Sequence, residues 1–146
     1  MKSDGGRLAE AQLILAAMGM PKAQQNPNAV YTFLAFTAVG PRTRWASAAA
    51  PRLTPHDVIA FADAKYGKTY AENTRETIRR QAIHQFVQGG VLQRNPDEPG
   101  LPTNSPRTHY ALTDEALELV RAFGTKGFDG AAAKFREAQG GGLAQR

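Results

Sequence analysis

The sequence contains no cysteine and only three histidines, His56, His84 and His109. The lack of thiols excludes disulfide bonds and cysteine-ligated metal sites, and histidines so widely separated do not suggest a zinc site. No apolar run is long enough to span a bilayer, and residues 1–6 do not begin a secretory signal. We therefore expect a cytoplasmic protein with no cofactor or metal of its own and no membrane partner.

Sequence patterns of common active sites are missing as well. The chain has no GxSxG, HExxH, GxGxxG or P-loop pattern. Pro96-Asp97 and the segment Asp63-Ala64-Lys65 look superficially like elements of metal-dependent nucleases. Their order is reversed, however, and Asp63 and Lys65 fall at the end of a predicted helix, where such a site needs a strand. We predict that this chain has no catalytic residues and is not an enzyme by itself.

The composition favours one soluble domain with an anionic partner. The 146 residues are 42% hydrophobic and 21% charged, which suits a globular protein with a packed core. Lysine and arginine total 18 against 13 acidic residues, which gives a net charge of +5. A basic balance favours nucleic acid as the partner. Many soluble proteins are mildly basic, so the placement of the charge decides more than its sum.

Helical periodicity and capping signals predict a mostly helical chain. Asn26-Pro27 and Thr54-Pro55 each combine a capping residue with proline at the first helical position, and Thr113 begins a later helix. Asn73, with Glu76 three residues later, has the pattern of a capping box. Trp45, in a loop over 40–53 and flanked by Arg42, Arg44 and Arg52, is expected to anchor the core, with a stacking platform as the alternative. The expected helices are residues 7–18, 27–39, 55–66, 74–88, 114–123 and a short one around 131–138.

The helix over 74–88 is followed directly by a predicted hairpin over 91–112. Its strands are expected at 91–94 and 107–112, with a polar tip between them. A helix followed by a hairpin is the order of a winged helix, a helix-turn-helix variant in which that helix enters the major groove and the hairpin is the wing. We predict a mostly α fold with a small β-hairpin, with extra N- and C-terminal helices. The expected divisions are a disordered 1–6, a DNA-binding domain at 7–124 and a C-terminal extension or linker at 125–146.

The helix over 74–88 has a polar face whose side chains suit base recognition. Arginine reads guanine, glutamine reads adenine, and threonine reads several bases, whereas a merely solvated face usually alternates Glu and Lys. By angle, Arg75 and Arg79 lie nearer the apolar side, so they either extend beyond the core to phosphates or pair with Glu72 or Glu76. At 100° per residue the polar face contains Thr74, Thr77, Arg80, Gln81, His84, Gln85 and Gln88.

Two other segments are candidates for phosphate contacts. In the hairpin, Asp97 and Glu98 lie at the tip and would be repelled by DNA, so contacts are expected from its flanks. The alternative is an ordinary surface hairpin. The segment before the second helix offers free N–H groups to a phosphate, or is a simple helix cap. The residues are Arg94, Asn95, Asn104, Ser105, Arg107 and His109 in the hairpin, and Lys22, Gln24, Gln25 and Asn26 before the helix.

The stretch AAMGMPKAQQN and the long segment from YGKTYAENTRETIRRQ to LVRAFGT resemble the N-terminal region of the BsuBI/PstI family of type II restriction endonucleases. The resemblance covers roughly residues 8–125. It implies an N-terminal winged-helix domain, a C-terminal PD-(D/E)xK nuclease domain that uses Mg²⁺, and a palindromic CTGCAG target. The nuclease half, with its catalytic and metal residues, is expected to be absent from this chain. The resemblance implies a DNA-binding role for Asn73, Thr74, Arg75, Thr77, Arg80, Gln81 and His84, and for Asn104, Ser105 and Arg107.

Two other hypotheses remain beside a domain that recognises double-stranded DNA for a restriction enzyme. The first is a stand-alone winged-helix regulator or a reader of adenine-methylated DNA. A regulator needs a dimer surface, for which residues 125–146 are too rich in glycine. The second is a protein-interaction domain whose basic charge only aids solubility. Neither the methylation preference nor the base read by each side chain follows from the sequence.

Overall fold

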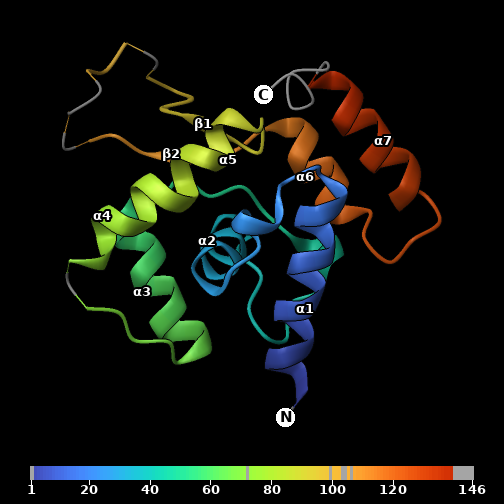
Figure 1. Ribbon diagram of the computed structural model, residues 1–146, viewed down its shortest axis with the longest axis horizontal. Coiled ribbons are helices and arrows are strands. Elements are labelled where there is room, and N and C mark those ends of the chain that lie inside the picture. Colours follow the sequence, from blue (N-terminus) through green and yellow to red (C-terminus); the bar gives the residue numbers. More distant parts are fainter. Residues whose placement is uncertain (1, 72, 99, 103–104, 106, 140–146) are drawn as a thin grey trace.

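The computed structural model describes residues 2–71, 73–98, 100–102, 105 and 107–139. Helix α2 (Pro27–Thr37) lies at the centre, with α1 (Lys2–Ala17) on one side and α3 (Pro55–Tyr66) on the other (Figure 1). The described helices include none that is both long and apolar enough to cross a membrane. The first helix begins at Lys2, so residues 2–6, expected to be disordered, extend α1. Each added helical residue contributes one backbone hydrogen bond, which favours extension of an existing helix.

The predicted caps of three helices are present. The Asn26 side chain accepts a hydrogen bond from the Ala29 amide at the start of α2, where Pro27 is the first residue. Thr54 and Asp57 form a reciprocal capping box at the start of α3. Thr113 caps α6 (Asp114–Arg121). Two short 3-10 helices, η1 (Lys22–Gln24) and η2 (Trp45–Ser47), lie in the connections.

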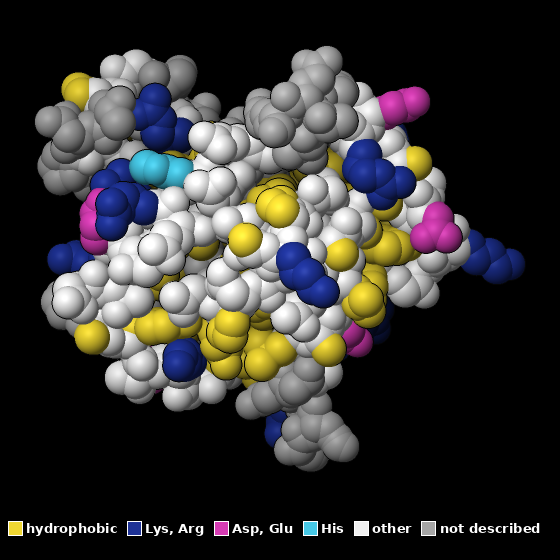
Figure 2. Space-filling view, viewed as in Figure 1, with side chains coloured by type: hydrophobic (Ala, Val, Ile, Leu, Met, Phe, Trp, Pro, Cys, Tyr) yellow, Lys and Arg dark blue, Asp and Glu magenta, His cyan; other side chains and the backbone are white. Residues whose placement is uncertain are grey.

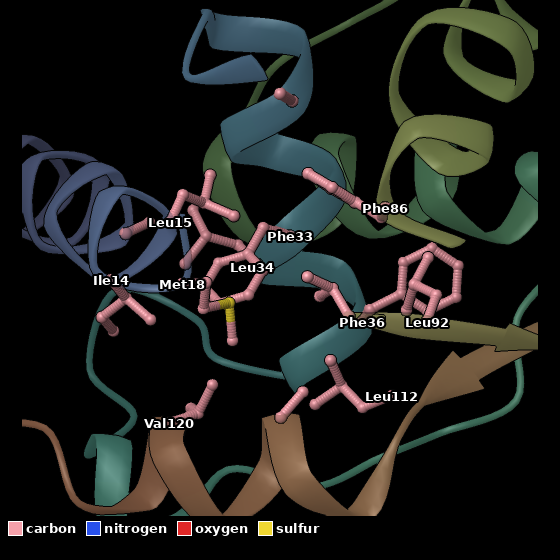
Figure 3. Packing of buried hydrophobic residues seen from close by; sticks show 14 of the residues in the cluster. Ile14, Leu15, Met18, Phe33, Leu34, Phe36, Phe86, Leu92, Leu112 and Val120 are labelled. Atoms are coloured by element: carbon pink, nitrogen blue, oxygen red, sulfur yellow. The ribbon is translucent and has the colours of Figure 1, made fainter. Parts of the chain in front are cut away.

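The core is built around α2. Eight of its residues are buried, including the hydroxyl-bearing Thr32 and Thr37, whose side chains bond to backbone carbonyls within the helix. A helix that is apolar on nearly all sides must be covered on all sides. Phe33 packs edge-on against Phe86, and Trp45 is buried beside it, as expected of a core anchor. Figure 3 shows Phe33, Leu34 and Phe36 of α2 meeting Ile14 and Leu15 of α1, Met18 just beyond that helix, Phe86, the hairpin residues Leu92 and Leu112, and Val120 of α6.

The predicted helix over 74–88 is continuous but not regular. It consists of α4 (Thr74–Ile78), the π-helical segment η3 (Arg79–Ile83) and α5 (His84–Gln88). Asn73 does not cap it, so the expected capping box is wrong: its φ and ψ of −75° and −1° are helical, and its side chain makes no capping bond. A cap needs an extended backbone at that position. Beyond the helix, Gly90 has a φ of +80°, a conformation that favours glycine.

The hairpin is shorter than predicted. Strands β1 (Leu92–Arg94) and β2 (Tyr110–Leu112) pair antiparallel, with Arg94 opposite Tyr110. The expected strand at 107–109 does not form, because Asn95 adopts a left-handed φ of +46° and its side chain accepts the His109 amide, which interrupts the regular ladder. Leu53 pairs with Tyr110 on the other side. The predicted loop over 40–53 therefore ends in a one-residue third strand.

Residues 128–138 form a helix that belongs to the core. Helix α7 (Phe128–Ala138) packs against α6, and Phe135 is 1% exposed. The sequence predicts a short helix around 131–138 within an extension or linker over 125–146, so the helix is longer than predicted and belongs to the core instead of a linker. Phe128, Ala132 and Phe135 are spaced by four and three residues, so a narrow apolar stripe is enough to fix one face of this helix in the core.

Candidate nucleic-acid interface

The pairing of Leu53 with Tyr110 defines how the winged helix is assembled. Read along the chain, the order is helix α2, the Leu53 strand, helix α3, the helix α4–η3–α5 and the hairpin β1–β2. Helix α3 and the following helix form the helix-turn-helix, with Gly67 in the left-handed conformation at the turn. The second helix of this motif is the one that enters DNA. The predicted winged helix is confirmed, with α1, α6 and α7 as additional helices.

One side of helix 74–88 is fixed in the core. Ile78, Ala82, Ile83 and Phe86 are buried. The opposite side carries the candidate residues at two levels of exposure. Arg80 and Gln81 are exposed, as is Arg75, while Thr74, Thr77, His84 and Gln85 are half-buried.

Arg75 and Arg79, which the helical angle of 100° per residue places near the apolar side, differ in their exposure and contacts. Arg75 is exposed in the first turn, before the core begins. Arg79 is half-buried and pairs with Glu76, which was the other expected possibility. The angle of 100° per residue also does not hold through the π segment, which has more residues per turn.

Glu76, Arg79, Arg80 and His84 form a charged network on this helix. Nε of Arg79 lies 3.2 Å from one carboxylate oxygen of Glu76, and Nη2 of Arg79 bonds to the other oxygen. Nε of Arg80 lies 3.7 Å from that second oxygen. The Arg79 hydrogen bonds hold the pKa of Glu76 below its ordinary value. The carboxylate is therefore ionised and joins two guanidinium groups.

His84 closes the network on the side of the hairpin. Nη1 of Arg79 lies 3.2 Å from Nε2 of His84. Because a guanidinium only donates, Nε2 must accept, so the imidazole is neutral with its proton on Nδ1. Burial, followed by the charge of Arg79, lowers the pKa of His84. Burial raises the pKa of Tyr110 in strand β2, and the positive charge of Arg79 acts against that rise.

The hairpin holds a second charged cluster. Nε2 of His109 lies 2.5 Å from Oδ1 of Asp97, while Arg52 lies 3.8 Å from the other oxygen of Asp97. Arg107 pairs with Glu98 at 3.5 Å. The acidic residues at the tip thus pair with cations both within the hairpin and in the segment beside it. Arg52 was not among the predicted site residues. The pairing of its neighbour Leu53 with Tyr110 brings it close to the hairpin, and this pairing is seen only in the folded structure.

Nδ1 of His109 faces the carbonyl oxygen of Arg107 at 2.8 Å. That hydrogen bond and the Asp97 carboxylate raise the pKa of His109, and the His109 bond lowers the pKa of Asp97. Both ring nitrogens face acceptors, which indicates an imidazolium. Figure 2 shows basic side chains, a histidine and an acidic side chain together at the upper left, where Figure 1 places helix α4–α5 and the hairpin.

Some of the remaining predicted contact residues already use their side chains in hydrogen bonds within the protein. The Ser105 hydroxyl accepts the Arg107 amide, and Asn104 lies outside the described residues. At the start of α2, the Asn26 side chain binds the Ala29 amide and the Ala23 carbonyl, and the Gln25 side chain binds the Met20 carbonyl. Asn26 acts as the simple cap and the Gln25 side chain is bonded within the preceding segment, whereas the Lys22 side chain is exposed.

The acidic residues that look superficially like nuclease elements in the sequence lie in two different parts of the fold. Asp63 and Lys65 lie on helix α3, as expected, rather than on a strand. The fold does bring Asp97, Glu98 and His109 together, with potential ligand atoms within 4.8 Å of one another, although the sequence spacing of the histidines gave no sign of this. Their carboxylates are already paired with Arg52, Arg107 and His109. The group therefore does not match a Mg²⁺ site, and we assign it no chemistry.

Residues 6–144 match the family described as the BsuBI/PstI restriction endonuclease HTH domain. The chain belongs to this family. It is 38% identical over 117 residues to the type II restriction enzyme BsuBI of Bacillus subtilis, which covers 80% of the chain and 37% of the relative. It is 28% identical over 124 residues to the type II restriction enzyme AplI of Arthrospira platensis, covering 81% of the chain and 36% of that relative.

The BsuBI/PstI HTH fold is also seen in a solved structure. The structure of SdaI restriction endonuclease superposes with a TM-score of 0.86 at 30% identity, over 93% of this chain and 43% of that one. This chain therefore spans less than half the length of each of these restriction enzymes.

Proposed function

We propose that this chain is the sequence-specific double-stranded-DNA-binding domain of a type II restriction endonuclease. Helix 74–88 would lie in the major groove, and the hairpin over 91–112 would contact the adjoining backbone. The observation that carries the proposal is the position of Arg80 and Gln81. Both are exposed on a helix whose opposite side is held in the core of a winged helix.

The residue types suggest how the contacts are divided. Arg80 and Gln81 are suited to guanine and adenine edges, both of which occur in a CTGCAG-type site. Thr74, Thr77 and His84 border them as secondary contacts. The proposed phosphate contacts come from three segments. They are Lys22 before α2, Asn73, Arg75 and Arg79 at the start of helix 74–88 and within it, and Arg94, Asn104, Ser105 and Arg107 in the hairpin.

Cleavage is assigned to another part of the parent enzyme. The relatives are named as type II restriction enzymes and are more than twice as long as the matched region. We propose a PD-(D/E)xK nuclease domain with Mg²⁺ there, and recognition without catalysis in this chain. The protein would act in the cytoplasm, where bacterial DNA is accessible.

The test is duplex binding by fluorescence anisotropy at several salt concentrations. Three duplexes are compared: one with CTGCAG, the same duplex with methylated adenine, and a scrambled control. Preference for either CTGCAG duplex, with affinity that falls as salt rises, supports the proposal and shows the methylation preference. Equal binding to all three would leave a non-specific DNA clamp, and no binding at all would favour the protein-interaction domain.

A further inference from the structure

The carboxylate of Glu76 lies among the cations of the proposed DNA-binding surface. Its side chain is 56% exposed, and it contacts Arg79 and Arg80, whose side chains are 35% and 64% exposed. The two contacts differ: Arg79 binds with both Nε and Nη2, whereas Arg80 approaches only to 3.7 Å. Arg79 is also held by His84. Arg80 is therefore the guanidinium that can leave Glu76 without breaking the rest of the network.

We propose that Glu76 is a specificity-determining residue that competes with DNA for Arg80 and repels non-specific phosphates. A carboxylate presents two acceptor atoms to a guanidinium, as do a phosphate group and the O6 and N7 edge of guanine. On a non-specific duplex, Arg80 gains a phosphate only by giving up Glu76, whose charge is then brought close to the backbone. On the cognate site, a base edge gives Arg80 a replacement partner. This inference rests on the proposed DNA-binding function.

Helix stabilisation alone would predict something different. Glu76 lies in the first turn of its helix, where the macrodipole favours a negative charge, and it pairs with Arg79 three residues later. A purely structural glutamate would affect cognate and non-specific binding alike, through the placement of Arg79. A competing carboxylate affects the two duplexes unequally, because only the cognate duplex offers Arg80 a matching base.

The experiment compares Glu76→Gln, Glu76→Asp and Glu115→Gln in the full chain. Glu115→Gln removes the same charge from the exposed side of α6, away from helix 74–88. With the scrambled duplex, Glu76→Gln should raise affinity about threefold at 50 mM salt, and the slope of log K against log salt should steepen by about 0.9, the contribution of one phosphate contact. Cognate affinity should change less, so the ratio of cognate to scrambled affinity should fall. Glu76→Asp, which retains the charge, should keep the ratio near that of the wild type.

The outcomes separate the two proposals. Equal effects of Glu76→Gln and Glu115→Gln on the scrambled duplex, with wild-type binding intact, would overturn the role of Glu76 alone. Loss of affinity for both duplexes in Glu76→Gln would show that Glu76 serves only to position Arg79. Absence of DNA binding by the wild-type protein would overturn both proposals. The His84 ring signals in NMR report directly on whether Arg79 has stayed in place.

Discussion

Leu53 and Tyr110 exchange two backbone hydrogen bonds, each with an N to O distance of 2.9 Å. The pair joins the residue just before the capping box of α3 to the second strand of the hairpin. The hairpin is therefore attached to the helix-turn-helix at two points, through its chain connection to α5 and through the pairing with Leu53. Since Tyr110 also lies opposite Arg94 in the register of β1 and β2, strand β2 has a neighbour along both of its edges.

Leu53→Pro should detach one side of this junction. Proline has no N–H, so the bond to the Tyr110 carbonyl is lost and that carbonyl is left in a buried position. We expect the free energy of unfolding to fall by about 1–3 kcal/mol, measured by urea denaturation. Leu53→Ala keeps both backbone bonds and reports the loss of side-chain packing. If the two variants were equally stable, the backbone pair would contribute nothing measurable.

Arg80→Ala and Gln81→Ala should weaken binding to the cognate duplex by about 1–3 kcal/mol each, with a smaller loss on the scrambled duplex. Arg107→Ala should weaken both duplexes alike, because a phosphate contact is independent of sequence. Anisotropy titrations measure both. Lys126→Ala, in the exposed connection between α6 and α7, is the charge-matched control. A cognate affinity that is unchanged in both helix variants would place the reading surface elsewhere.

Asn26→Ala should destabilise the domain by about 1 kcal/mol, whereas Asn73→Ala should change its stability little. The reason is that Asn26 accepts the Ala29 amide at 2.9 Å and Asn73 makes no capping bond. Thermal or urea unfolding of the two variants gives the comparison. An equal loss of stability in Asn73→Ala would indicate that Asn73 does cap its helix, as the sequence suggested. If Asn73→Ala weakens DNA binding at unchanged stability, Asn73 contacts DNA.

The two histidines of the interface should titrate in opposite directions from the ordinary pKa of 6.5. The raised pKa of His109 means that its hydrogen bond to the Arg107 carbonyl and its contact with Asp97 add stability below pH 6.5, and that this stability is lost as the pH rises through the raised value. The lowered pKa of Asp97 means that its part is present above its ordinary 3.8 and lost as the pH falls through the lowered value. The contact is therefore strongest between about pH 4 and pH 6.5.

The lowered pKa of His84 has the opposite sign. Protonation is disfavoured in the folded protein, so this group reduces stability as the pH falls below 6.5. NMR titration of the imidazole signals, assigned with His84→Gln and His109→Gln, checks both directions. A His84 midpoint above that of His109 would contradict the two hydrogen-bonding arrangements.

Phe135→Ala should lower the free energy of unfolding by about 3–5 kcal/mol, because the side chain is buried in the common core. Glu137→Ala, exposed near the end of the same helix, is the control and should have little effect. Denaturant unfolding should remain a single transition in both. A negligible loss of stability in Phe135→Ala would indicate that α7 adds little to the core and that 125–146 is a linker.

The sequence predicted those parts of the fold that depend on neighbouring residues. The caps at Asn26, Thr54 and Thr113 use side chains within three residues of the amide they bind, so their signals are local. The bridge at Leu53 and the burial of α7 arise from contacts with distant segments. A single bridging residue or a stripe of three apolar side chains carries too little periodicity to be seen beforehand.

The candidate site was predictable in its residue types but not in its connections. The polar composition of helix 74–88 is visible in the sequence, and so is the possible pairing of Arg79 with Glu76. The contact of Arg79 with His84 depends on the π segment, which the local sequence pattern did not predict. The contact of Asp97 with His109 joins residues 12 apart through the turn at Asn95. Such pairs require the folded backbone.

Helix α7 also sets the order in which the domain can be completed during synthesis. Arg136 of α7 donates to the carbonyl oxygen of Ala17, 119 residues earlier, and Phe135 shares a core with Ile14 of α1. A ribosome releases the chain from its N-terminus, so α1 emerges long before the helix against which its end is fixed. Until α7 has emerged, part of the apolar surface of α1 and α6 stays uncovered. A translational pause before α7 has emerged would therefore lengthen the time in which the nascent domain can bind chaperones or aggregate.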